Sequence, residues 1–181
     1  MLNKITFLIT FILFSAVTNS TEGISFNAKI KVDLNEVIET GTVTPVNGIS
    51  AAGQPNENAF KVFAKEGYTT VIDLRTSSED RGLNEPKVVS ELGMNYVSLP
   101  IGKDGLTFEN AKILNKYLEQ ASGPVLLHCG SSNRVGAMLA LSKKLSGLDV
   151  NNALSIGRSA GLTSLENAVI KVLRSNNLKE D

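Results

Sequence analysis

The sequence contains one cysteine, one histidine and no tryptophan among its 181 residues. A lone cysteine cannot form a disulfide within the chain, and one cysteine with one histidine supplies too few soft ligands for a zinc site. We therefore expect neither a metal nor another cofactor. The two rare residues are adjacent, as His128 and Cys129, and Arg134 follows shortly after them. This segment is the strongest candidate for a catalytic site in the sequence.

An excess of charge of one sign is also absent, because 18 basic and 18 acidic residues give a formal net charge of zero. Loss of an N-terminal segment that contains Lys4 would leave the chain slightly acidic. A chain with this balance has no broad basic face for the phosphates of a nucleic acid. We expect no nucleic-acid partner.

The apolar stretch at residues 5–14 is too short to be a membrane-spanning helix, which needs roughly 20 residues. Lys4 precedes this stretch, and small or polar residues occupy most of positions 15–20. The pattern is typical of a secretory signal peptide over residues 1–20, which predicts an exported protein, periplasmic or secreted. Membrane attachment is expected only if this segment stays uncleaved.

The remaining length is that of one ordinary domain. Residues 24–32 alternate loosely between apolar and polar side chains, so we expect residues 21–44 to form an N-terminal arm or strand. Residues 45–175 are expected to form the single folded domain.

Within that domain, short apolar segments alternate with segments of helical periodicity. The sequence predicts strands at residues 49–52, 69–74, 95–99 and 125–127, and helices at residues 57–66, 86–92, 107–120, 135–145, 150–159 and 165–173. This alternation favours an α/β fold with a mostly parallel central sheet flanked by helices. In such a sheet, ligands bind beyond the carboxyl ends of the strands, where Arg75, Cys129 and the loop after Leu99 would emerge.

Cys129 and the loop that follows it combine a nucleophile with an anion-binding site. A loop of small residues that leads into a helix exposes backbone N–H groups, and the positive end of the helix dipole favours both a thiolate and a bound anion. The planar fork of Arg134 can hold two phosphoryl oxygens. The residues expected to bind substrate are Gly130, Ser131, Ser132, Asn133, Val135 and Arg75.

Three further residues have predicted supporting roles. His128 precedes the nucleophile in a strand, so its side chain is expected on the opposite face, where it either hydrogen-bonds the loop backbone or is simply buried. Asp73 is expected to pair with Arg75 and brace the loop. Asp104, which lies between glycines, is either the proton donor for the leaving alkoxide or an ordinary turn residue.

The pattern from His128-Cys129 to Arg134 resembles the cysteine-dependent phosphatases of the dual-specificity kind. A closer resemblance is to the bacterial phosphatase-like domain of beta-lactamase hydrolase-like proteins, and it extends over about residues 45–175. It rests on four segments in the same order: Ala-Gly-Gln-Pro from Ala52, Thr-Val-Ile-Asp-Leu-Arg from Thr70, Gly-Leu-Thr from Gly105 and Asn-Arg-Val-Gly-Ala from Asn133. The resemblance implies a cysteine-phosphatase-like three-layer architecture without a metal. It also implies Cys129 as a nucleophile that forms a phosphocysteine, Arg134 as the phosphate clamp, Asp104 as the acid and a phosphorylated small molecule or protein as the substrate.

Two departures from the usual phosphatase loop keep other functions open. Only four residues separate Cys129 from Arg134, one fewer than is usual, and Val135 stands where a hydroxyl residue commonly follows the arginine. The shorter spacing resembles that of rhodanese-type sulfurtransferases, which carry a persulfide on cysteine. A module that binds anions or phosphoproteins without turnover is the third possibility.

Overall fold

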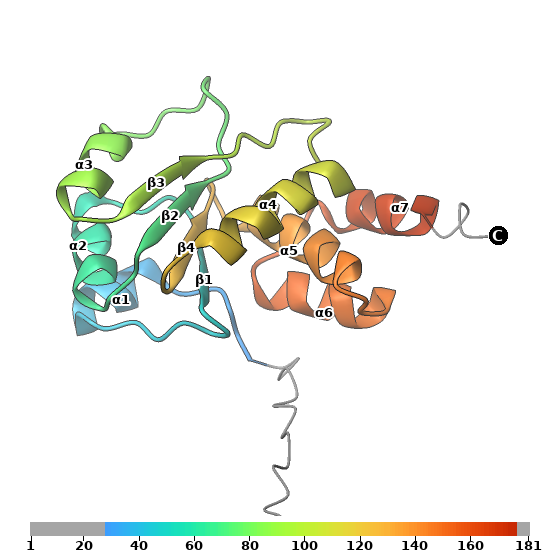
Figure 1. Cartoon of the computed structure of the whole chain (residues 1–181), viewed down its shortest axis with the longest axis horizontal. Helices are drawn as coiled ribbons and strands as arrows, with labels where there is room; N and C mark the ends of the chain where they lie inside the picture. Colours follow the sequence, from blue (N-terminus) through green and yellow to red (C-terminus); the bar gives the residue numbers. More distant parts are fainter. Residues whose placement is uncertain (1–27, 177–181) are drawn as a thin grey trace, which may run out of the picture.

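The protein has a parallel sheet between two layers of helices (Figure 1). The computed structural model describes residues 28–176, and the predicted signal peptide lies outside them. Within these residues the sheet contains β1 (Ile49–Ala52), β2 (Thr70–Asp73), β3 (Asn95–Ser98) and β4 (Val125–His128), in the order β1-β4-β2-β3. All strand pairs are parallel, which confirms the predicted α/β class. Strand β4 lies between two neighbours and all four of its residues are buried, which explains its apolar sequence.

The helices cover the two faces of the sheet separately (Figure 1). One face carries α1 (Leu34–Thr40), α2 (Glu57–Lys65) and α3 (Glu85–Glu91). The other carries α4 (Phe108–Gln120) and α5 (Asn133–Leu145), with α6 (Val150–Ser159) and α7 (Glu166–Asn176) packed beyond them. Each face has its own apolar cluster, so the predicted three-layer architecture is confirmed.

Side-chain caps set several helix starts close to where the sequence predicts them. The side chains of Asn56, Thr107 and Asp149 each accept a hydrogen bond from a backbone N–H of the first turn. Helix α1 was not predicted. It has a capping aspartate, Asp33, and its apolar residues Leu34, Val37 and Ile38 have helical spacing, but the helix is only seven residues long.

Residues 30–32 of the N-terminal arm lie beside β1. The N–H of Ala51 donates to the carbonyl of Ile30 at 3.0 Å, and the N–H of Val32 donates to the carbonyl of Ala51 at 2.9 Å. Within residues 28–176, no helix is both long and apolar enough to cross a membrane.

Helix α5 is held by a close crossing with α6. A Cβ atom on Gly136 would lie 2.3 Å from the backbone N of Leu162 and 2.4 Å from the carbonyl oxygen of Gly157. Only glycine permits this approach. The crossing fixes the helix whose first turn follows the cysteine loop.

Candidate active site

The cysteine loop connects the central strand to the start of α5. Cys129 follows β4 directly and is only 1% exposed to solvent. Two residues later, Ser131 forms a bridge with Gly53, and the N–H of Gln54 donates to the carbonyl of Gly130 at 3.3 Å. The Gly-Gln part of the Ala-Gly-Gln-Pro motif therefore braces the loop from the neighbouring strand.

The loop enters α5 through a left-handed residue. Ser132 has φ 72° and ψ −6°, and its hydroxyl donates to the carbonyl of Ala160 at 2.8 Å instead of capping the helix. The first-turn N–H groups of α5 thus donate no hydrogen bond to the capping side chain. They remain donors for an anion at this helix end.

The guanidinium of Arg134, in the first turn of α5, donates hydrogen bonds to one carboxylate and two backbone carbonyl oxygens. Its Nη1 and Nη2 donate to the two carboxylate oxygens of Glu79 at 2.6 and 2.5 Å, and Nη1 also lies 3.3 Å from the carbonyl oxygens of Leu74 and Ile101. The hydrogen bonds to Glu79 raise the pKa of Arg134, burial opposes them, and the nearby Cys129 sulfur raises it further. The same hydrogen bonds lower the pKa of Glu79 to about 2.

A cavity of about 450 Å³ opens beside this arginine. Its lining comes from the cysteine loop and three other segments: Ser131, Asn133 and Arg134, then Thr76 and Glu79, then Ile101, Gly102, Lys103 and Leu106, and finally Leu165. The cavity lies at the carboxyl ends of the strands, where the parallel sheet predicts a ligand site.

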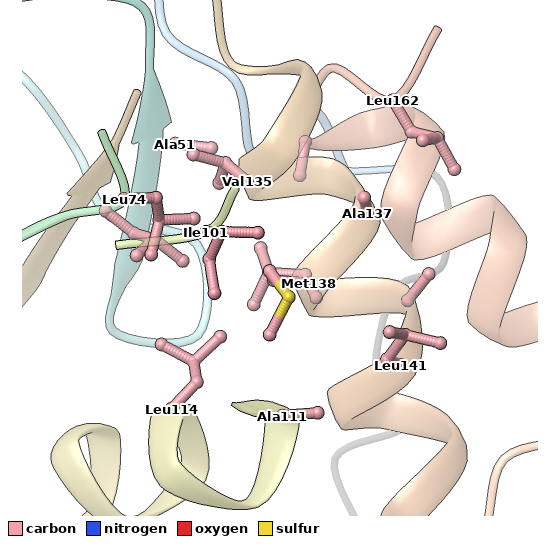
Figure 2. Close-up of a cluster of buried hydrophobic side chains, with 14 of the residues drawn as sticks. Ala51, Leu74, Ile101, Ala111, Leu114, Val135, Ala137, Met138, Leu141 and Leu162 are labelled. Carbon is pink, nitrogen blue, oxygen red and sulfur yellow. The ribbon is translucent and has the colours of Figure 1, made fainter. Parts of the chain in front are cut away.

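The predicted loop residues take different positions around this cavity. Gly130 and Ser131 are exposed. Ser132 is fully buried, and the side chain of Val135 packs in the core near Ala51, Leu74 and Ile101 (Figure 2). Only the backbone of Val135 can serve an anion.

Asn133 uses its side chain to fix the neighbouring segment. Its Oδ1 accepts a hydrogen bond from the N–H of Thr163 at 2.9 Å, and its Nδ2 donates to Ser164 at 2.7 Å. Asn133 lines the cavity, but its side-chain amide is already engaged in these two hydrogen bonds.

Arg75 does not reach the cavity, contrary to our expectation that it binds substrate. Its side chain is fully buried, its Nε donates to Asp73 at 2.9 Å, and its Nη2 contacts both Asp73 and Glu85. The predicted pairing with Asp73 is present. The guanidinium thus turns inward because two buried carboxylates need a cation there.

His128 faces the opposite side of the sheet from Cys129, as strand alternation predicts, and packs edge-on against the ring of Phe60. Its partner is not the loop backbone, however. Its Nε2 lies 2.8 Å from Oε1 of Glu85, a fully buried carboxylate in α3. Asp73, Glu85 and His128 present ligand atoms within 4.8 Å of one another, but Arg75 already supplies the positive charge that a metal would bring.

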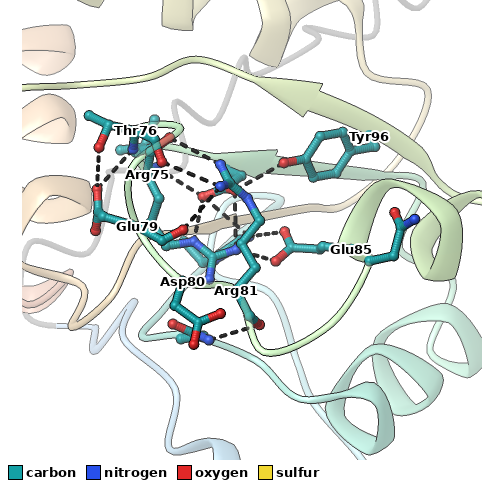
Figure 3. A network of polar contacts seen from close by, with 12 residues as sticks. Arg75, Thr76, Glu79, Asp80, Arg81, Glu85 and Tyr96 are labelled. Carbon is teal, nitrogen blue, oxygen red and sulfur yellow. Dashed lines mark hydrogen bonds and ion pairs between the residues drawn. The ribbon is translucent and has the colours of Figure 1, made fainter.

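Asp73 is the hub of a buried network that includes Arg75, Arg81 and Tyr96, which are labelled in Figure 3. Besides Arg75, it accepts hydrogen bonds from Nε of Arg81 at 3.0 Å and from the hydroxyl of Tyr96 at 2.9 Å. Burial alone would raise the pKa of Asp73, but the hydrogen bonds from Arg75 and the electrostatic interaction with His128 lower it to about 2. Burial and the charge of Asp73 raise the pKa of Tyr96 to about 12.

Asp104 lies in an exposed turn at the rim of the cavity. The N–H of Gly105 donates to the carbonyl of Gly102 at 3.1 Å across this turn. Gly102, Lys103 and Leu106 line the cavity, whereas Asp104 between them does not. The structure therefore places Asp104 near the site but does not bring its carboxylate to Cys129.

Sequence reasoning missed two carboxylates of this region, Glu79 and Glu85. The sequence predicts no role for residues 76–81. One signal was available: Glu79 follows a predicted strand, at the edge of the sheet where the cysteine loop also emerges. Glu85 sits in the first turn of a helix, where an acidic residue ordinarily lies on the surface.

The comparisons with known proteins agree with this geometry. Residues 39–146 match the family model described as beta-lactamase hydrolase-like protein, phosphatase-like domain. The chain belongs to this family. Beta-lactamase hydrolase-like proteins of Xylella fastidiosa and Agrobacterium fabrum are 30% and 25% identical over 105 and 103 residues, which is 55% of this chain in each case. The chain spans about a quarter of the length of these relatives, 24% of each.

Solved structures show the same fold. TpbA of P. aeruginosa in complex with pTyr has a TM-score of 0.58 and 18% identity, and the similarity covers 80% of this chain and 92% of that one. Tk-PTP in its active form has a TM-score of 0.55 and 21% identity, with coverage of 70% and 91%. The family model is that of a phosphatase-like domain, and these structures share the fold of this chain.

Proposed function

We propose that the chain is a cysteine-dependent phosphatase that hydrolyses phosphate monoesters through a phosphocysteine on Cys129. The observation that carries this proposal is the position of Cys129 between the buried end of β4 and the start of α5, whose first turn carries Arg134. A helix N-terminus and a guanidinium favour the thiolate, which is the nucleophilic form.

The proposed reaction has two steps. The Cys129 thiolate attacks phosphorus, the bond to the leaving oxygen breaks, and that oxygen takes up a proton. Water then attacks the phosphocysteine and releases inorganic phosphate and the thiolate. In both steps Arg134 and the first-turn N–H groups of α5 hold the non-bridging oxygens, so their charge is stabilised without reorganisation.

The leaving oxygen needs a proton donor, for which two carboxylates are available at the cavity. Glu79 is a poor donor, because its hydrogen bonds with Arg134 lower its pKa to about 2 and keep it ionised. Asp104 lies in the rim turn between residues that line the cavity. We therefore propose Asp104 as the acid, which requires the turn of residues 102–105 to close over a bound ester.

The cavity walls suit a phosphate ester with an apolar group. Ile101, Leu106 and Leu165 line it, and Lys103 adds a cation at its edge. The substrate is either a phosphoprotein or a phosphorylated small molecule. The complex of TpbA with pTyr makes phosphotyrosine one of the first compounds to test.

A sulfurtransferase is the second candidate, and the short spacing favours it. With four residues between Cys129 and Arg134, the loop encloses less space than a longer one. A persulfide on Cys129 would add one sulfur atom to the protein. Formation of thiocyanate from thiosulfate and cyanide would identify this activity.

The test is hydrolysis of an aryl phosphate by the purified chain, with and without vanadate. We expect activity that vanadate inhibits, that Cys129→Ser abolishes and that Arg134→Lys lowers by about 10²–10³-fold, because an ammonium cannot reproduce the bidentate contact. Activity that survives in Cys129→Ser would exclude a phosphocysteine mechanism.

We also propose export to the periplasm or exterior, on the strength of the predicted signal peptide. Expression of the full chain in a bacterial host tests this. N-terminal sequencing of the exported product would show a start near residue 21, whereas retention of the intact chain in the cytoplasm would exclude export.

A further inference from the structure

We propose that Leu165 is a specificity-determining residue of the cavity and that Asn133 is the positioning residue that holds it in place. The inference rests on the proposed function and deepens it, because it names the contact that selects an ester by its apolar group. Asn133 is the first residue of α5 and directly precedes Arg134. Leu165 ends the connecting segment, residues 160–165, between α6 and α7. All three residues line the cavity.

The side-chain amide of Asn133 contacts three consecutive residues of the connecting segment. Its Oδ1 accepts hydrogen bonds from the backbone N–H of Thr163 at 2.9 Å and from that of Leu165 at 3.4 Å. Its Nδ2 donates to the hydroxyl of Ser164, between them, at 2.7 Å. Two of these contacts hold backbone groups, so they fix the path of the chain at Leu165 and not only the direction of one side chain.

The first half of the connecting segment is held in a different way. Ala160 and Leu162 are buried in the core, at 0% and 4% exposure. After Leu162 the chain returns to the surface, where Thr163 and Ser164 are exposed. Packing therefore secures the start of the segment, whereas Asn133 joins its exposed second half to the cysteine loop.

Leu165 gives the cavity an apolar surface that is in place before a ligand binds. Three apolar side chains line the cavity, but Ile101 is only 1% exposed and has almost no surface left for a ligand. Leu106 and Leu165 are half-buried and keep such a surface. Leu106 follows the rim turn, which has to close over a bound ester in the proposed reaction. Leu165 needs no closure, and a preorganised contact costs less to form than one that the ligand must order.

Asn133 links two parts of the site that come from different stretches of the chain. The cysteine loop lies within residues 39–146, which match the family model, and the connecting segment lies outside them. The neighbour of Asn133, Arg134, holds the phosphoryl oxygens in the proposed reaction, while the Asn133 side chain holds the apolar wall. The spacing between the anionic and the apolar group of an accepted ester thus depends on this residue.

Two other roles for these contacts would give different results. If Asn133 bound the phosphoryl group itself, its loss would weaken the binding of every phosphate-like ligand alike. If the ion pair between Arg158 and Glu166, at 2.6 Å, held the connecting segment instead, loss of the Asn133 amide would change no affinity. A role in holding Leu165 predicts weaker binding only of ligands that carry an apolar group.

The first experiment measures the binding of phenylphosphonate and of methylphosphonate to the full chain by calorimetry. The two compounds share one anionic group and resist hydrolysis, so the ratio of their Kd values reports on the apolar group alone. We expect the wild type to bind phenylphosphonate about tenfold more tightly or better. Leu165→Ala and Asn133→Ala should each raise the Kd of phenylphosphonate by about five- to tenfold and leave that of methylphosphonate unchanged.

The matched control is Leu118→Ala, which makes the same truncation in α4. Leu118 lines a separate hollow at the start of strands β1 and β4, so both Kd values should stay unchanged. Leu165→Ala leaves the backbone contacts of Asn133 intact, and it therefore tests the apolar wall even where Asn133→Ala fails to fold. Equal Kd values for the two phosphonates in the wild type, no binding of either, or an unchanged ratio in Leu165→Ala would overturn the proposal. An equal rise of both Kd values in Asn133→Ala would overturn the role given to Asn133.

The second experiment compares the hydrolysis of phenyl phosphate with that of a small alkyl phosphate. Leu165→Ala should lower kcat/KM by about tenfold for the phenyl ester and hardly at all for the alkyl ester. The double variant with Asn133→Ala should lose no more than either single variant, because both changes remove one contact. Additive losses would contradict action through Leu165. If the wild-type chain hydrolyses neither ester, the proposed function fails, while the phosphonate Kd ratio still decides the role of Leu165.

Discussion

The Nε2 atom of His128 lies 2.8 Å from Oε1 of Glu85. The residue before the cysteine is therefore linked to the first turn of α3, on the same face of the sheet. Both side chains are fully buried, and Glu85 also pairs with buried Arg75. The carboxylate thus serves two polar groups that have no access to water. Its loss would leave His128 without its hydrogen-bond partner and Arg75 with Asp73 alone.

Substitution of Glu85 is therefore expected to destabilise the fold strongly. Glu85→Ala should lower the free energy of unfolding by about 3–5 kcal/mol, the cost of breaking a buried ion pair from one side. Urea unfolding measures this change. Glu91→Gln, on the exposed part of the same helix, should change the stability by less than about 0.5 kcal/mol. A similar small effect for both variants would contradict the assigned role of Glu85.

Asp73 should make the stability depend on pH in acid. Its pKa is lowered from the ordinary 3.8 to about 2 in the folded chain, so its contribution is complete above pH 3.8 and is lost as pH falls through about 2. The shift corresponds to about 2 kcal/mol. Unfolding curves of wild type and Asp73→Asn, recorded from about pH 5 downwards, should converge as the pH falls. A constant difference would show that the carboxylate charge is not what stabilises the fold.

Gly136 should not tolerate even a methyl group. A Cβ atom there would meet the backbone of Leu162 and Gly157 at 2.3 and 2.4 Å, so α5 and α6 would have to separate. We expect Gly136→Ala to destabilise the fold by about 1–3 kcal/mol. At an open helical position the same change stabilises by about 1 kcal/mol. The sign of the measured change in thermal or urea unfolding therefore shows whether the crossing of α5 and α6 excludes a methyl group.

The role of Asp104 as the acid can be tested with phosphate esters that differ in their leaving group. Asp104→Asn should lower kcat for an alkyl phosphate by about 10²–10⁴-fold and for an activated aryl phosphate by much less, because the aryl oxide leaves without a proton. The pH profile for the alkyl substrate should also lose its basic limb. Equal losses for both substrates would assign Asp104 to the turn alone.

Local sequence signals predicted much of the fold. The strand at residues 49–52 and the helix at residues 150–159 have the predicted bounds, because turn residues and caps mark their ends. Helix α1 was missed although Leu34, Val37 and Ile38 have helical spacing, because seven residues are too few for that periodicity to stand out. Its capping aspartate and the glycine that ends it, Gly41, were further signals in the sequence.

The site was less predictable because its contacts are distant in sequence. The cysteine loop could be located from the order of His128, Cys129 and Arg134. The partners of that loop could not, since Glu79 is 55 residues from Arg134 and Glu85 is 43 residues from His128. Arg75 leaves a strand at the correct edge of the sheet, but two buried carboxylates turn its side chain inward. Such outcomes depend on tertiary packing, which residue spacing does not encode.

The most direct test of the proposed mechanism is the covalent state of Cys129 during turnover. Wild-type chain is mixed with an aryl phosphate, quenched in acid and analysed by mass spectrometry, beside Cys129→Ser and beside wild type treated with thiosulfate. Our account predicts one phosphoryl group on the Cys129 peptide of the wild type and none in the variant. Turnover of the ester without a phosphoryl group on Cys129, or addition of a single sulfur from thiosulfate with no hydrolysis of the ester, would contradict it.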